Sequence, residues 1–139
     1  MFEGTSFGKT VDILHRSMDV SVLRRQVISD NIANADVPNF KRSTVNFEAS
    51  LKKAIESERM KPELDLAVTD PRHLPAWQPT DYRTVEPRRV LDYLTTSKNN
   101  GNNVDAEEEL MASLENQLMY TLQAQALNFE YGQINLVLR

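Results

Sequence analysis

Few side chains in this sequence have the types and spacing that chemistry needs. The 139 residues include two histidines, His15 and His73, and no cysteine. The run Asp70-Pro71-Arg72-His73 could contribute to a metal or acid–base site, but such a site needs three or four converging ligands. Three consecutive acids, Glu107 to Glu109, are ordinary in the first turn of a helix. We therefore expect no catalytic residue, no metal ligand and no cofactor, and we do not expect an enzyme.

Composition excludes several other classes of function. The four glycines are scattered, so no glycine-rich phosphate loop is present. A net charge of −4 argues against a protein that binds nucleic acid by neutralising phosphates. No apolar run approaches the roughly 20 residues of a membrane-spanning helix. We expect neither a nucleic-acid partner nor a small-molecule substrate, and no cleaved signal peptide.

The prolines divide the chain into three segments. All six lie between Pro38 and Pro87, and proline breaks helix interiors. The sequence therefore predicts an N-terminal helix within residues 1–34 and a C-terminal helix within residues 104–139. The middle region, 35–103, is expected to be irregular or β-rich and to contain a proline-rich loop.

The N-terminal helix is predicted from Lys9 to Asn34, with apolar residues on two faces. Positions spaced three or four residues apart fall on one side of a helix. One face holds Val11, Leu14, Met18 and Val22, and the nearly opposite face holds Ile13, Val20, Leu23 and Val27.

The C-terminal helix is predicted to begin at Asp105 as N-cap, with Glu108 completing a capping box. It too has two apolar faces. One comprises Met111, Leu114, Leu118, Leu122, Phe129 and Leu136. The other, with the 3.5-residue repeat of a coiled-coil seam, comprises Tyr120, Ala124, Leu127, Tyr131, Ile134 and Leu138.

A single pair of helices can bury only one face of each. The pattern therefore predicts that these apolar positions pack between subunits, against other copies or partner proteins. The alternative, an ordinary intramolecular core, stays open at this point. The expected fold is mainly α, with the long terminal helices packed as an antiparallel coiled-coil-like pair and a small irregular or β-containing middle region.

Several short elements are expected in the middle region. Residues 46–60 have the periodicity of a helix. Leu64 to Thr69 alternates partly as a strand would, and Asp70 to Pro79 is expected to be an extended loop. Tyr82–Glu86 and Val90–Thr95 are possible short strands.

The stretch from Asn31 to Arg42 resembles the N-terminal signature of bacterial flagellar axial proteins, which read roughly Asn-Ile-Ala-Asn-x-x-Thr-Pro-Gly-Tyr-Lys. Val37, Asn39 and Phe40 replace the usual Thr, Gly and Tyr, and asparagine tolerates a left-handed backbone. The segments 69–74, 101–111 and 129–138, with Asn116 and Tyr120, also resemble the short proximal-rod subgroup. The signature residues are Asn31, Ile32, Ala33, Asn34, Pro38, Phe40 and Lys41.

This resemblance implies a structural subunit of the flagellar basal-body rod. Such proteins are exported by the flagellar type III system without a cleaved signal and assemble helically into a drive shaft that encloses the export channel. The implied partners are copies of the chain, other rod proteins, the adaptor to the MS ring, and the export gate. Two alternatives are the sister short rod protein and a non-flagellar helical adaptor or coiled-coil protein.

Overall fold

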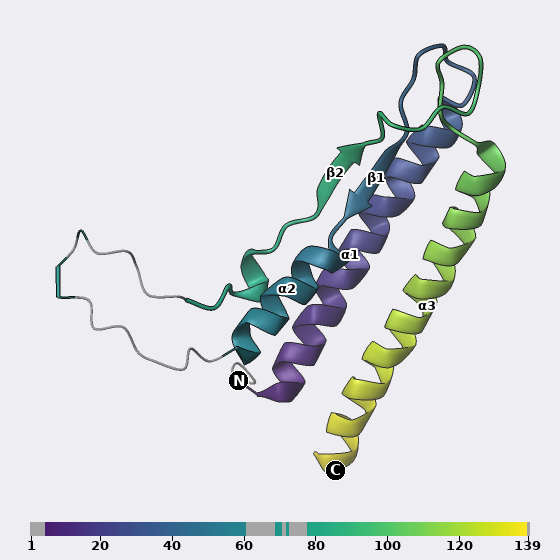
Figure 1. Ribbon diagram of the computed structural model, residues 1–139. Helices are drawn as coiled ribbons and strands as arrows, with labels where there is room; N and C mark the ends of the chain where they lie inside the picture. The colour runs from purple at the N-terminus through teal and green to yellow at the C-terminus, as the bar shows by residue number, and fades with distance from the viewer. Residues whose placement is uncertain (1–4, 61–68, 71, 73–77, 139) are drawn as a thin grey trace. The chain divides into compact units, whose positions relative to one another are not determined.

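The computed structural model describes residues 5–60, 69–70, 72 and 78–138 (Figure 1). The chain divides into two compact units. One comprises Met1–Val45 together with Arg89–Arg139, and the other comprises Asn46–Arg88. Along the sequence the elements are α1 (Ser6–Ala33), β1 (Ser43–Asn46), α2 (Glu48–Arg59), the 3-10 helix η1 (Tyr82–Thr84), β2 (Arg88–Leu91) and α3 (Ala106–Val137). The fold is mainly helical with one small two-stranded sheet, as the sequence predicts.

Helix α1 begins three residues before the predicted start. The side chain of Thr5 accepts a hydrogen bond from the backbone nitrogen of Gly8 at 3.1 Å, which satisfies one of the free donors of the first turn. The helix ends at Ala33. Pro38 follows within a few residues, and the segment between them turns back on itself through hydrogen bonds such as Val37 N to Asn34 O.

Helix α3 begins directly after Asp105, whose side chain accepts from the backbone nitrogen of Glu107 at 2.9 Å. The Glu108 carboxylate, which the sequence predicts to complete a capping box, instead accepts a hydrogen bond from Arg42 at 3.0 Å. The three glutamates at 107–109 lie in the first turn, where the helix dipole favours negative charge.

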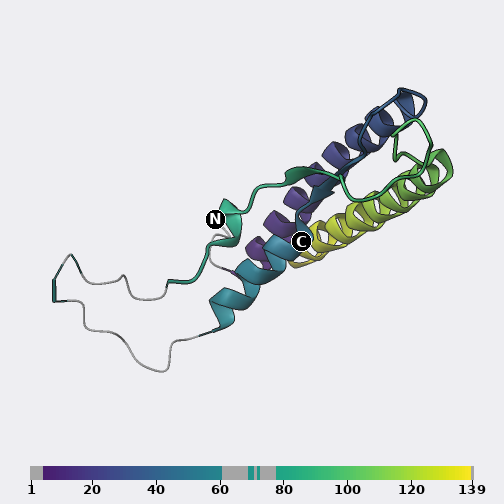
Figure 2. The ribbon, with the colours of Figure 1, turned by 45° about the horizontal axis from the view of Figure 1, so that its top comes forward.

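The long terminal helices pack side by side (Figures 1 and 2). Their side-chain contacts join the end of α1 to the start of α3, as in Asn31 with Glu109, and the start of α1 to the end of α3, as in His15 with Tyr131. The two helices therefore run in opposite directions within one compact unit.

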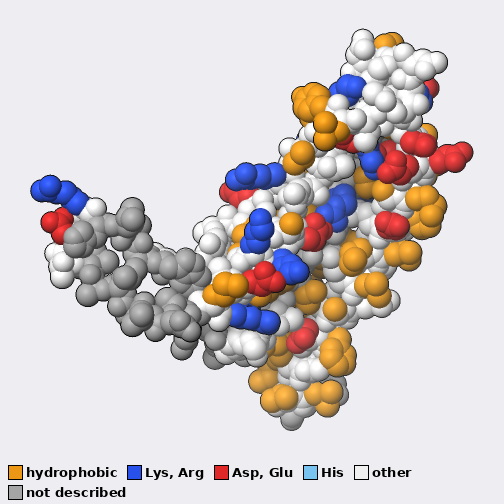
Figure 3. All heavy atoms as spheres, viewed as in Figure 1, with side chains coloured by type: hydrophobic (Ala, Val, Ile, Leu, Met, Phe, Trp, Pro, Cys, Tyr) orange, Lys and Arg blue, Asp and Glu red, His pale blue; other side chains and the backbone are white. Residues whose placement is uncertain are grey.

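The buried apolar side chains of α1 are Val20, Val27 and Ile28. In contrast, the buried residues of α3 are Glu109 and Asn116, which are both polar. Its apolar side chains remain largely open to solvent, and many line the helix in Figure 3. We use the name outer face for six of them that are each more than half exposed: Met111, Leu114, Leu118, Leu122, Phe129 and Leu136.

The middle region differs from expectation at three places. The strand expected at Val90–Thr95 is β2, which spans Arg88–Leu91 and ends before Asp92. Tyr82–Glu86 does not form a strand, because the side chain of Asp81 accepts from Arg83 N and its carbonyl from Thr84 N, which closes the helical turn of η1. Strand β1, which pairs with β2, was not expected. Helix α2 lies within the range predicted for it. The expected strand at Leu64, most of the proline-rich loop and His73 lie outside the described residues.

Two further observations concern function. None of the described helices is long and apolar enough to span a membrane. Within the same residues, no group of three or more His, Cys, Asp or Glu side chains is placed to hold a metal ion.

Candidate assembly interface

Asn31 joins three elements at the end of α1. Its side chain is 1% exposed. The amide nitrogen donates to the backbone oxygen of Ser43 at 2.8 Å and to the Glu109 carboxylate at 3.1 Å. The amide oxygen accepts from the backbone nitrogen of Ser43 at 3.0 Å. Asn31 therefore mimics a neighbouring strand for β1 while it contacts the first turn of α3.

The turn after α1 adopts a conformation that few residues tolerate. Asn39 has φ of 60°, and its backbone nitrogen donates to Asn100 O at 3.1 Å. Gly101 has φ of 78°, and a Cβ built there would lie 2.6 Å from Asn39 Oδ1. The ammonium group of Lys41 donates to the carbonyl of Gly101 at 2.7 Å. The signature turn therefore contacts residues 100–101 through one backbone hydrogen bond and through the side chains of Asn39 and Lys41.

Asn102 is fully buried and hydrogen-bonds to the backbone of that turn. Its amide nitrogen donates to the carbonyls of Asn34, Ala35 and Val37 at 3.0, 2.9 and 2.8 Å. Its amide oxygen accepts from Val104 N at 2.7 Å. One side chain thus binds three carbonyls of the turn that follows α1.

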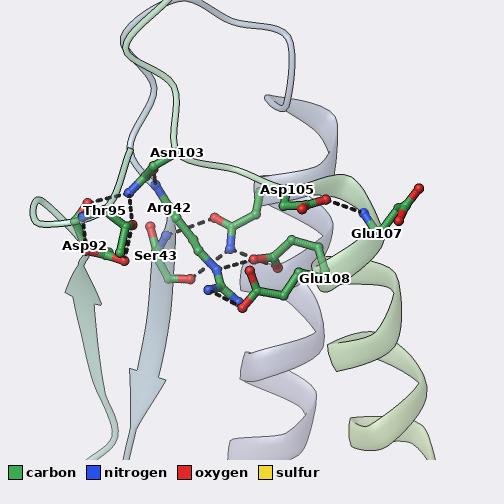
Figure 4. A network of polar contacts seen from close by, with 10 residues as sticks. Arg42, Ser43, Asp92, Thr95, Asn103, Asp105, Glu107 and Glu108 are labelled. Carbon is green, nitrogen blue, oxygen red and sulfur yellow. Dashed lines mark hydrogen bonds and ion pairs between the residues drawn. The ribbon is translucent and has the colours of Figure 1, made fainter. Parts of the chain in front are cut away.

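Arg42 connects the signature to α3 by charge. Its guanidinium binds the buried carboxylate of Glu109 and reaches the exposed carboxylate of Glu108 at 3.0 Å (Figure 4). Partial burial alone would lower the pKa of Arg42, but the hydrogen bond and charge of Glu109, together with Glu108, raise that pKa above its usual value. Hydrogen bonds between ionised groups are stronger than neutral ones.

A second cluster lies on the other side of Arg42. The backbone nitrogen of Arg42 donates to Asn103 Oδ1 at 2.6 Å, and Asn103 Nδ2 donates to Asp92 O at 2.7 Å and to Thr95 Oγ1 at 3.1 Å (Figure 4). The Thr95 hydroxyl donates to the Asp92 carboxylate at 2.6 Å. This hydrogen bond, with those from the backbone of Leu94 and Thr95, lowers the pKa of Asp92.

The signature residues do not all enter these contacts. Asn31, Asn34 and Lys41 make side-chain hydrogen bonds. Ile32 and Phe40 are half-buried, whereas Ala33 and Pro38 are exposed.

The predicted packing positions fall into three classes of exposure. Val27 is buried. Half-buried positions are Val11, Leu14, Met18, Leu23, Leu127 and Ile134. Exposed positions are Val22, Met111, Leu114, Leu118, Tyr120, Leu122, Tyr131 and Leu138.

Sequence periodicity missed the residues that contact each other most. Asn102 and Asn103 lie in a run of asparagine and glycine residues that has no helical periodicity, and no role was predicted for Arg42 or Ser43. The available signal was the likeness of segment 101–111, which includes both asparagines and Glu109, to the flagellar subgroup. A polar side chain that matches a family pattern and lies in a largely apolar helix, as Glu109 does, is a candidate for a specific contact.

The whole arrangement holds backbone segments together and offers no converging nucleophile, acid and base among the described residues. What it can do is fix the end of α1, the turn after it and the start of α3 relative to one another. The outer face of α3 is then left exposed, and large exposed apolar patches are typical of interaction sites.

Comparison with known proteins points to the same segment. A family model described as flagella basal body rod protein matches residues 24–41. The chain is 46% identical over 133 residues to the flagellar basal body rod protein FlgB of Borreliella burgdorferi, covering 96% of this chain and 98% of that protein. It is 30% identical to FlgB of Bacillus subtilis, with 95% of both chains covered, and 29% identical to FlgB of Escherichia coli, with 85% and 82% covered.

Proposed function

Because this chain belongs to the FlgB family of flagellar basal body rod proteins, we propose that it acts as a structural subunit of the proximal rod. It assembles helically with other rod proteins into a drive shaft, which transmits motor torque and encloses the export channel. The observation that carries this proposal is the outer face of α3, where six apolar side chains are each more than half exposed.

The energetics of the outer face favour assembly. Burying a leucine or phenylalanine side chain contributes about 1.5–3 kcal/mol relative to leaving it in water. The outer face has four leucines, one phenylalanine and one methionine on one side of a 32-residue helix, where a neighbouring helix can contact them. We propose that α1 and α3 pair as an antiparallel coiled coil and that the predicted packing residues contact neighbouring subunits.

The proposed partners follow from the family and from this surface. They are copies of this chain, other rod proteins, the adaptor that joins the rod to the MS ring, and the export gate at the rod base. The chain reaches the basal body by flagellar type III export, without cleavage of a signal peptide. It acts without a cofactor and not as an enzyme, in keeping with the structural role of its family.

The relatives compared above are FlgB proteins, which favours this assignment over the sister short rod protein. A non-flagellar helical adaptor would have a similar apolar surface. It would not account for the 46% identity to a FlgB protein over 96% of the chain.

The test replaces Leu118, which is 57% exposed in the single chain. In Leu118→Asp a charge would be buried between subunits, so we expect cells to lose motility and purified basal bodies to lack the variant. Leu118→Met is the matched control, because it keeps an apolar side chain of similar volume. Both purified variants should keep the parent's helical circular dichroism. Motile cells whose basal bodies contain Leu118→Asp would contradict the proposal.

A further inference from the structure

The two buried side chains of α3, Glu109 and Asn116, are polar and contact α1, whereas the outer face is turned away. Glu109, Asn116 and Gln123, which we call the polar ladder, are spaced seven residues apart, so they share one side of the helix. Glu109 is 1% and Asn116 7% exposed, and Gln123 is half-buried. The outer face lies on nearly the opposite side at about 100° per residue.

Each member of the polar ladder has a partner on α1. Glu109 accepts from Asn31 at 3.1 Å. Asn116 Nδ2 donates to the carbonyl of Ser21 at 2.9 Å. Gln123 Nε2 donates to Ser17 Oγ at 3.0 Å, and Gln123 Oε1 accepts from Ser21 Oγ at 3.2 Å.

Apolar burial alone would favour the opposite rotation of α3. A buried leucine gains more free energy than a typical net hydrogen bond, so the outer face would be the better apolar partner for α1. However, rotating α3 would place leucines against Ser17, Ser21 and Asn31 and remove the hydrogen bonds that these residues make to α3, which is costly in a buried site.

The ladder also carries a cost of its own. The Oδ1 atom of Asn116 is buried without a hydrogen-bond partner among the described residues. A leucine at that position would avoid this cost. Buried polar residues that reduce stability while selecting one packing arrangement are well known from coiled coils.

We infer that the polar ladder selects which side of α3 packs on α1 and thereby keeps the outer face turned outward. Glu109, Asn116 and Gln123 are positioning residues in this sense. The role concerns a single chain and goes beyond the proposed assembly, because it explains how the apolar surface stays available before any partner binds.

The chain contains no cysteine, so an introduced thiol is the only one present. Leu118→Cys places it on the outer face and Leu127→Cys places it at a half-buried position of α3. In the otherwise unchanged full-length protein, we expect a soluble maleimide to react about tenfold faster with the thiol from Leu118→Cys than with that from Leu127→Cys.

The two thiols are then compared in a chain carrying Asn116→Leu and Gln123→Leu, and in one that adds Glu109→Leu. We expect the ratio of the two rates to fall stepwise toward one, because α3 loses its preferred side. A matched control with Gln117→Leu and Gln125→Leu, two exposed positions off the ladder, should keep the parent ratio.

The ratio separates positioning from a simple loss of stability. A general loss of stability would speed maleimide labelling of the Leu127→Cys thiol without slowing labelling of the Leu118→Cys thiol. Rotation of α3 would slow labelling of the Leu118→Cys thiol. An unchanged ratio in all ladder variants, a fall only through faster labelling of both thiols, or a parent ratio near one would each overturn the inference. Motility plays no part in this measurement, so failure here would leave the proposed rod function standing.

Discussion

The side-chain amide of Asn31 lies 3.1 Å from the carboxylate of Glu109, although 78 residues separate them in the sequence. This contact joins the last turn of α1 to the first turn of α3, and Arg42 binds the same carboxylate. The family signature is therefore one half of a polar network, and its other half lies in residues 100–109.

Glu109 and its neighbour Glu108 give a matched pair of substitutions. Glu109→Ala should lower the free energy of unfolding by about 2–4 kcal/mol, because Arg42 and Asn31 lose a buried charged partner. Glu108→Ala should cost less than about 1 kcal/mol, since the Glu108 side chain is 61% exposed. Urea unfolding followed by circular dichroism measures both, and equal losses would show that Glu109 has no special role.

Asn102→Asp should be among the most damaging conservative changes. It keeps the shape of the side chain, removes the donor that serves three carbonyls, and brings a carboxylate against them. We expect a loss of roughly 2–4 kcal/mol or protonation of the new carboxyl group. Thermal unfolding of both variants checks this, and Asn99→Asp, at an exposed position, should stay within about 0.5 kcal/mol of the parent.

Two glycine-to-alanine changes should have opposite signs. Gly101→Ala requires a side chain at φ of 78° and close to Asn39, so it should destabilise by about 1–2 kcal/mol. Gly132→Ala lies within α3, where no atom lies within 4 Å of the new Cβ, and should stabilise by about 0.5–1 kcal/mol. The difference in melting temperature between the two variants checks the sign, and stabilisation by Gly101→Ala would contradict the turn geometry.

Thr95→Val should return the pKa of Asp92 toward its ordinary value, because the Thr95 hydroxyl is the main cause of the lowered pKa. A lowered folded pKa means that Asp92 contributes stability above its unfolded pKa of about 3.9. That contribution is lost as the pH falls through the lower folded pKa. NMR titration of the carboxyl carbon measures the shift directly, and Thr121→Val, whose hydroxyl binds backbone carbonyls in α3, should leave it unchanged.

Leu127→Asp should fail for a different reason from Leu118→Asp. Leu127 is already half-buried in the single chain, so an unpaired charge there should lower monomer stability by about 1–3 kcal/mol. Leu118→Asp should leave monomer stability nearly unchanged. Unfolding of both purified variants checks this, and equal stability would mean that the two positions are not on different sides of α3 in the free chain.

Local patterns predicted the long elements well. Apolar spacing and the distribution of proline placed helices at 9–34 and from 105 onward, and the structure has them at Ser6–Ala33 and Ala106–Val137. These features depend on neighbours three or four residues away, which a sequence shows directly. Strand β1 was missed because four residues carry little periodic signal, and Asn31 rather than a long ladder supports it.

Periodicity could not predict the contacts of the site, because the contacting residues lie far apart in the sequence. Asn102 binds Ala35 across 67 residues, and Arg42 binds Glu109 across 67 as well. Periodicity also ranks apolar residues as the contact side of a helix, whereas Asn116 and Gln123 face α1. Only the family resemblance pointed to residues 101–111, and it did so without indicating what they touch.

The long separation between Asn31 and Glu109 also bears on the order in which the molecule can acquire its structure. A ribosome delivers the chain from its N-terminus, so the contact between Asn31 and Glu109 cannot form until residue 109 has been synthesised, and the Asn31 amide stays open to water until α3 is in place. Closing so long a loop carries an entropic cost that α1 alone cannot offset, and such non-local contacts slow folding. The signature segment is thus committed to its native form only when more than three quarters of the chain already exists.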